Sequence, residues 1–107
     1  MIIRPDAPVF LKVEGHSGSG KKGEDIVCAA VSALAQTTVL GITRIAGVEQ
    51  NLAVRDGFIQ SEIDVKEITP RKKEALKIIL DLFCMGIFEI LRGNEEFIEI
   101  NFENSVK

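Results

Sequence analysis

Tryptophan and tyrosine are absent from this chain, and phenylalanine occurs only six times. So few aromatic side chains do not supply a platform on which the bases of single-stranded nucleic acid could stack. Cysteine occurs twice and histidine once, too few for a disulfide framework or a four-ligand zinc site. We therefore expect no metal or other cofactor, and two free thiols fit a reducing, cytoplasmic compartment.

Positive charge is also scarce, because 13 Lys and Arg residues face 16 Asp and Glu residues and leave a net charge of −3. This balance gives no general basic surface for nucleic acid or for an anionic membrane. Residues 1–14 contain no continuous apolar segment, so no signal peptide is predicted. The uncharged run 26–43 reaches the lower length of a membrane span, roughly 17 residues. Because Ser32, Gln36 and Thr37 interrupt it, we interpret it as a buried helix.

The length of 107 residues corresponds to one domain, residues 1–107. Apolar residues make up 46% of the chain and charged residues 27%, proportions typical of a globular protein with a core. Residues 9–14 alternate between apolar and polar side chains, which predicts a half-buried strand. Residues 1–4 are expected to form its short partner strand.

A hairpin is the next predicted feature. Asp56-Gly57 predicts a two-residue turn between strands over 48–55 and 58–65, with Arg55 opposite Phe58. That register gathers the apolar side chains of both strands on one face: Val48, Leu52, Val54, Ile59, Ile63 and Val65.

Two helices are predicted. The first opens with two acidic residues, as the helix dipole favours, and covers about 24–40, or 24–46 at most. The second has Thr69 as its N-cap and Pro70 at its first position, and Gly93 ends it. Helical periodicity predicts that the second helix buries Leu76, Ile79, Leu80, Phe83, Ile87 and Leu91.

A last strand is predicted over 97–102, which completes the order β-β-α-β-β-α-β. Because hairpins join both strand pairs, we expect a largely antiparallel sheet with both helices on one face, an α+β fold of two layers. The other face of the sheet would remain uncovered. This face suggests a homodimer, although part of it is polar because of Glu49, Asn51, Glu62 and Asp64.

The segment from Gly15 to Cys28 holds the residues typical of a functional site, and three chemistries compete for it. Gly15–Lys22 nearly matches the phosphate-binding pattern G-x-x-x-x-G-K-[ST], but Lys22 stands where a magnesium-binding hydroxyl is needed. Two acidic residues then follow where phosphates need bare amides. Gly18–Gly23 matches the dinucleotide pattern G-x-G-x-x-G, but the predicted order lacks its parallel β-α-β unit. A flexible loop is the simpler interpretation of both patterns.

The third chemistry is thiol catalysis. Cys28 is expected in the first turn of the first predicted helix, where the helix dipole favours the thiolate form. His16 lies in the preceding loop and could take the thiol proton. Asp25 and Ser32 share a helix face with Cys28, so Asp25 could cap the helix or orient the imidazole and Ser32 could support the thiol. The competing interpretation is a buried cysteine and a solvent-exposed histidine. Cys84 has apolar neighbours and is predicted to belong to the core.

At these residues the chain resembles a known family. Gly15-His16-Ser17 together with residues 23–32 closely resembles the signature of the ribosomal-processing cysteine protease Prp family. The resemblance is dense over 14–38, with one departure at Ser17, where a small Ala is frequent. It implies that Cys28 is the nucleophile and His16 the general base. It also implies that three further motif residues support the site: Gly15, Asp25 and Ser32.

Members of that family are similar in removing the N-terminal extension of the large-subunit ribosomal protein numbered twenty-seven. The resemblance therefore implies a cysteine endopeptidase whose partner is this precursor peptide, and it implies a homodimer. The alternative is a non-catalytic ribosome-assembly adaptor that binds the same peptide. Neither hypothesis requires direct contact with nucleic acid or a membrane.

Overall fold

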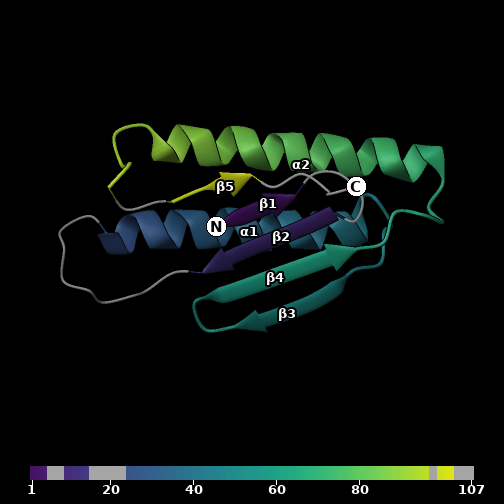
Figure 1. Ribbon diagram of the computed structural model, residues 1–107, viewed down its shortest axis with the longest axis horizontal. Coiled ribbons are helices and arrows are strands. Elements are labelled where there is room, and N and C mark those ends of the chain that lie inside the picture. The colour runs from purple at the N-terminus through teal and green to yellow at the C-terminus, as the bar shows by residue number, and fades with distance from the viewer. Residues whose placement is uncertain (5–8, 15–23, 97–98, 103–107) are drawn as a thin grey trace.

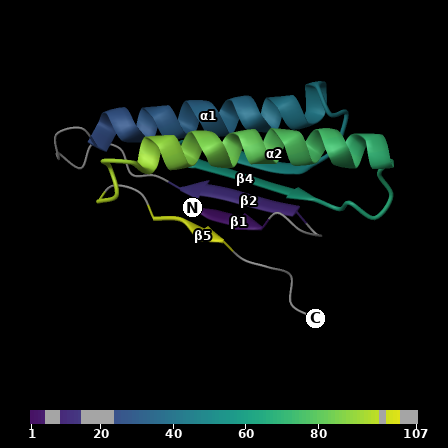
Figure 2. The same cartoon turned by 90° about the horizontal axis from the view of Figure 1, so that it is seen from above.

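The computed structural model describes residues 1–4, 9–14, 24–96 and 99–102. The elements follow the order β1 (Ile2–Arg4), β2 (Val9–Glu14), α1 (Glu24–Arg44), β3 (Asn51–Arg55), β4 (Phe58–Ile63), α2 (Pro70–Leu91) and β5 (Asn101–Phe102). Both helices lie side by side on one face of the sheet (Figures 1 and 2), so the predicted two-layer α+β fold is confirmed.

The sheet has the strand order β3-β4-β2-β1-β5. Neighbouring strands are antiparallel except for β1 and β5, which are parallel. The last strand, predicted over 97–102, consists of only Asn101 and Phe102, and residues 99 and 100 are not part of it. It pairs with β1, which has only three residues and therefore offers few main-chain partners. The amino group of Met1 donates to the carbonyl oxygen of Glu99 (2.9 Å), and the amide of Asn101 donates to the carbonyl oxygen of Met1 (2.8 Å).

The predicted hairpin is confirmed in its register. Arg55 pairs with Phe58, and Gly57 has a φ of 72°, which the tight turn requires and glycine adopts without strain. The first strand begins later than predicted, at Asn51 instead of residue 48. The reason is that the amide of Val48 donates to the carbonyl oxygen of Ile42, so residues 48–50 still follow the end of α1.

One predicted apolar face is only partly buried. Ile59 and Ile63 of β4 are buried, but Leu52 and Val54 of β3 are 47% and 55% exposed. β3 is the edge strand, and the two helices lie over the central strands of the sheet. Periodicity therefore identifies the correct face of β3 but not how far the helical layer extends over it.

Helix α2 begins as predicted, with the hydroxyl oxygen of Thr69 accepting a hydrogen bond from the amide of Lys72 (3.2 Å). Just beyond its end, Gly93 has a φ of 79°. Four of its six predicted core residues are buried, namely Leu76, Leu80, Phe83 and Ile87. The other two, Ile79 and Leu91, are half-buried.

By length and hydropathy alone, Ile26–Arg44 of helix α1 could cross a membrane. In the structure, 33% of this apolar stretch is buried inside the protein. In the structure, Val31 and Ala35 pack in a core cluster with Phe83 of α2 and Leu11 of β2. A second cluster joins Ile42 to Leu76, Leu80 and Ile63 near the other end of the helix. Through these contacts α1 packs in both core clusters together with α2 and the sheet.

Candidate active site

Two of the five predicted site residues have described side chains, and both lie on α1. Cys28 lies one turn after Glu24, the first residue of the helix, and is half-buried. It therefore lies just past the first turn rather than within it. Its side chain nevertheless points back toward the N-terminal end, as helix side chains do. Ser32 follows one turn later on the same side of the helix and is also half-buried.

The other three residues precede or open the helix. Gly15 and His16 lie outside the described residues, as does the whole glycine-rich segment 15–23. Asp25 lies in the first turn of α1. The ends that border this segment are described: β2 ends at Glu14, opposite Phe58, and α1 starts at Glu24.

The two catalytic candidates are each close in sequence to a described end of the glycine-rich segment. His16 is two residues past the end of β2, and two extended residues span at most about 7 Å. Cys28 is four residues past the start of α1, about 6 Å along the helix axis. Both views place the end of β2 and the start of α1 at the same end of the molecule (Figures 1 and 2). The fold thus places the two backbone attachment points of the predicted dyad at one end of the helical layer.

Ser32 has a polar neighbour that the motif analysis did not assign. Its hydroxyl oxygen accepts a hydrogen bond from the side-chain amide of Gln36 at 3.0 Å. The hydroxyl proton of Ser32 stays available for a second hydrogen bond, because a hydroxyl donates and accepts at once. The signal in the sequence was the i, i+4 spacing of two polar residues on an otherwise apolar helix.

A second polar cluster fixes the position of α1 above the sheet. The side-chain amide of Gln50 donates to the carbonyl oxygen of Val39 (2.7 Å) and to the hydroxyl of Thr43 (2.8 Å). Its carbonyl oxygen accepts from the hydroxyl of Ser61 on β4 (2.6 Å), which is only 1% exposed. We call Gln50, Ser61 and Thr43 the polar clip. Sequence analysis missed it because its members are brought together only by the fold.

The polar clip also shows which side of α1 carries Cys28. Cys28, Ser32, Val39 and Thr43 are separated by four, seven and four residues, so they lie along one flank of the helix. Gln50, which immediately precedes β3, contacts Val39 and Thr43. The flank of α1 that holds Cys28 and Ser32 therefore faces the side of the molecule where β3 forms the edge of the sheet.

Leu52 and Val54 form an exposed apolar shelf on this side. They pair with Ser61 and Ile59, so they share the sheet face that the helices cover. β3 starts next to Gln50 and ends at Arg55, which pairs with Phe58. Phe58 in turn pairs with Glu14, the last residue of β2. The apolar shelf thus lies on the flank of α1 that carries Cys28, but β3 runs beside the C-terminal half of that helix (Figure 1).

The second cysteine differs from the first in its surroundings. Cys84 is half-buried and packs against the core cluster around Phe83, as predicted. Burial raises the pKa of the Cys84 thiol, and the negative charge of Asp81 raises it further. Both effects favour the neutral thiol, which is a poor nucleophile. Of the two thiols, Cys28 is the better candidate.

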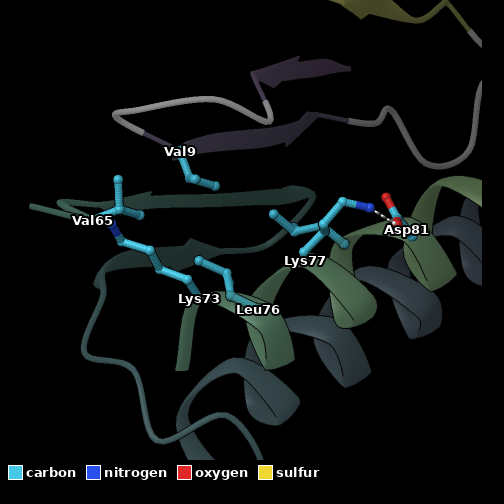
Figure 3. Close-up of a pocket in the computed structure, with 7 residues that line it drawn as sticks. Val9, Val65, Lys73, Leu76, Lys77 and Asp81 are labelled. Atoms are coloured by element: carbon cyan, nitrogen blue, oxygen red, sulfur yellow. Dashed lines mark hydrogen bonds and ion pairs between the residues drawn. The ribbon is translucent and has the colours of Figure 1, made fainter. Parts of the chain in front are cut away.

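A cavity of about 300 Å³ lies elsewhere, at the N-terminal end of α2. Its floor is apolar, with Val9 and Leu76, and its rim carries Lys73 and Lys77 (Figure 3). Lys77 is held by an ion pair with Asp81 at 2.8 Å. The cavity contains none of the predicted site residues. Within the described part of the chain, no group of three His, Cys, Asp or Glu side chains is arranged to hold a metal ion.

Comparison with known proteins gives consistent results. The sequence profile of the family described as cysteine protease Prp matches residues 5–99. The crystal structure of SMU.848 from Streptococcus mutans is 30% identical, with a TM-score of 0.69, and the match covers 97% of this chain and 90% of that one.

Two further crystal structures share the fold. They are of an essential ribosomal processing protease Prp from S. aureus, one with a substrate peptide and one with a covalently linked product peptide. Their identities are 20% and 21% and their TM-scores 0.78 and 0.74, and each match covers 95% of this chain and 96% of the other. No curated protein matches the sequence.

Proposed function

This chain belongs to the cysteine protease Prp family, and from that premise we propose that it is a cysteine endopeptidase with Cys28 as nucleophile and His16 as general base. The observation that carries this assignment is the position of Cys28, half-buried near the start of α1. The amides and dipole at a helix start favour an anionic sulfur and an anionic oxygen nearby.

The chemistry has two steps. The thiolate of Cys28 attacks the carbonyl carbon of the scissile bond, and the imidazolium of His16 gives the thiol proton to the leaving amine as the C–N bond breaks. Water then attacks the resulting thioester while His16 takes a proton from it. The carboxylic acid leaves and the thiol is restored. Amides near the start of α1 would stabilise the tetrahedral oxyanion, by about 3 kcal/mol per donor.

Three motif residues are assigned supporting roles. Asp25 is the second residue of α1, so it lies inside the helix and is not its N-cap, and we assign it the other role considered, orienting the imidazole of His16. Ser32 would support the thiol of Cys28 from one turn below, and Gln36 would hold the Ser32 hydroxyl in place through their 3.0 Å hydrogen bond. Gly15 precedes the imidazole and would let the backbone turn there.

The proposed substrate is the N-terminal extension of the large-subunit ribosomal protein numbered twenty-seven. Two observations support a peptide that binds in extended form along β3. Leu52 and Val54 offer exposed apolar surface on the flank of α1 that carries Cys28, and β3 is an edge strand to which a peptide can add main-chain hydrogen bonds. The S. aureus Prp protease, which shares the fold, has been crystallised with a substrate peptide.

We further propose a cytoplasmic location and a homodimer. Cys28 and Cys84 do not form a disulfide bond, which suits a reducing compartment. Large apolar side chains of both helices and of β3 are exposed, which supports association.

A peptide-cleavage experiment tests the proposed activity. The purified protein is mixed with a synthetic peptide that spans the N-terminal extension, and the products are followed by mass spectrometry. The parent protein and Cys84→Ala are expected to release two fragments, whereas Cys28→Ala is expected to release none. Cleavage by Cys28→Ala at the parent rate would refute the nucleophile. Binding of the peptide by the parent without any cleavage would favour the adaptor alternative.

A further inference from the structure

The cavity at the N-terminal end of α2 has no part in the proposed peptidase chemistry. Its volume is about 300 Å³, and its walls come from α2, from the first residue of β2 and from the segment that follows β4. The N-terminal end of α2 lies at the opposite end of the molecule from the start of α1, near which Cys28 lies (Figures 1 and 2). A ligand in this cavity would therefore leave the proposed active site open.

The inner wall of the cavity is apolar and withdrawn from water. Val9, Leu76 and Leu80 line it and are 5%, 2% and 6% exposed. Protein interiors are packed closely and leave few voids larger than one water molecule. A space of this size beside buried aliphatic side chains favours an aliphatic group, which gains dispersion contacts there and loses contact with water.

The volume of the cavity limits the size of the ligand. One water molecule takes about 30 Å³ in the liquid, so 300 Å³ corresponds to about ten non-hydrogen atoms. A medium-chain aliphatic acid has this size. The acyl chains of membrane phospholipids are longer, so the size of the cavity favours a free acid over a lipid that stays in a bilayer.

The mouth of the cavity determines which head group the ligand carries. The ammonium groups of Lys73 and Lys77 lie there, one helical turn apart on α2. Lys77 forms an ion pair with Asp81 at 2.8 Å, so its charge is already balanced. Within the described part of the chain, no carboxylate pairs with Lys73, whose side chain extends away from Asp81 (Figure 3). Lys73 can therefore bind an anion without losing an existing partner.

We propose that this cavity binds a free aliphatic carboxylate of about ten non-hydrogen atoms. The carboxylate lies at the ammonium group of Lys73, and the chain lies against Val9, Leu76 and Leu80. The apolar wall contributes to the affinity in proportion to the aliphatic surface that it removes from water. The head group stays on the Lys73 side, because the carboxylate of Asp81 disfavours an anion on the other side.

A titration followed by nuclear magnetic resonance tests the site. Sodium octanoate, which has about ten non-hydrogen atoms, is added to the nitrogen-15-labelled protein at about 0.15 M salt. The amides of Val9, Val65, Leu76 and Leu80 are expected to shift, with a dissociation constant on the order of 1 mM. No shift at these residues up to about 10 mM octanoate would refute the site.

A ligand of opposite charge tests the role of the head group. Octylammonium has the same chain as octanoate and is expected to bind at least about threefold more weakly, since it gains no ion pair with Lys73. Equal affinity of the two ligands would refute the proposal, because the cavity would then not select an anion. Octanoate is also expected to raise the melting temperature, because a ligand that binds only the folded state stabilises it.

Two variants with the same charge change separate the cavity from a general effect of positive surface. Lys73→Glu alters the mouth and is expected to weaken octanoate binding at least about fivefold. Lys72→Glu is the matched control, because Lys72 does not line the cavity and its side chain lies next to Gly47. Both lysines are exposed, so both variants should fold, which circular dichroism checks. Equal weakening by the two variants would refute the cavity as the binding site.

The remaining outcomes identify the source of the ligand and separate this inference from the proposed function. The parent protein is expected not to sediment with phosphatidylglycerol vesicles. Sedimentation that Lys73→Glu abolishes would overturn the assignment to a free acid. Octanoate binding by a protein that cuts no peptide would refute only the peptidase assignment. Cleavage by a protein that binds no octanoate would refute only this site.

Discussion

Replacing Gln50 by alanine is the most informative test of how α1 is held over the sheet. The substitution removes three short hydrogen bonds, to Val39, Thr43 and Ser61. Each is worth about 1 kcal/mol net, and the Ser61 hydroxyl, 1% exposed, would lose its partner. We therefore expect Gln50→Ala to lower the free energy of unfolding by about 2–3 kcal/mol, measured by urea denaturation with circular dichroism.

The design includes a control and a cycle. Asn51→Ala changes an exposed neighbour and is expected to stay within about 0.5 kcal/mol of the parent. Ser61→Ala alone is expected to cost about 1 kcal/mol. The double variant Gln50→Ala/Ser61→Ala should be more stable than the sum of the single effects predicts, by about 1 kcal/mol, because the two groups interact directly. A loss below about 0.5 kcal/mol for Gln50→Ala would show that the polar clip does not position α1.

Three more predictions follow from individual positions. Gly41→Ala is expected to raise the free energy of unfolding by about 1 kcal/mol, because alanine favours the helix and its methyl group would lie 3.8 Å from the nearest atom of Ile79, an ordinary contact. Gly86→Ala is the control, because its methyl group would lie only 2.7 Å from a methyl group of Leu34. A thermal melt should therefore show a gain in stability for Gly41→Ala and none for Gly86→Ala. Burial raises the pKa of the Cys84 thiol, so the unfolded chain loses this proton more readily than the folded protein, and stability should fall as the pH rises through the ordinary thiol value of 9.0. Iodoacetamide should also label Cys84 more slowly in the native protein than in the urea-unfolded protein. Equal labelling rates would contradict the raised pKa. Val54→Asp should raise the KM for peptide cleavage about tenfold with little effect on folding, while Asn51→Asp, on the other face of β3, should leave it unchanged.

Local chemistry explains which parts of the fold could be predicted. The hairpin register follows from Asp56-Gly57, and the start of α2 follows from Thr69, because each signal acts on its immediate neighbours. The exposure of Leu52 and Val54 could not be predicted, since it depends on where the helical layer ends over the sheet. Periodicity carries no information about that boundary.

The same distinction applies to the site. The spacing of Cys28 and Ser32 on one helix placed them together on one flank, and the structure agrees. The polar clip joins α1 to two distant segments, so no local pattern indicated it. The role of His16 stays a prediction, because its segment lies outside the described residues.

The central claim is that Cys28 forms a covalent bond with the peptide it cuts. Mass spectrometry of the protein quenched in acid during turnover measures this directly. The account predicts an added mass equal to the N-terminal fragment of the peptide, less one water, on the tryptic peptide that contains Cys28. An unmodified Cys28 throughout turnover, or the added mass on Cys84, would contradict it.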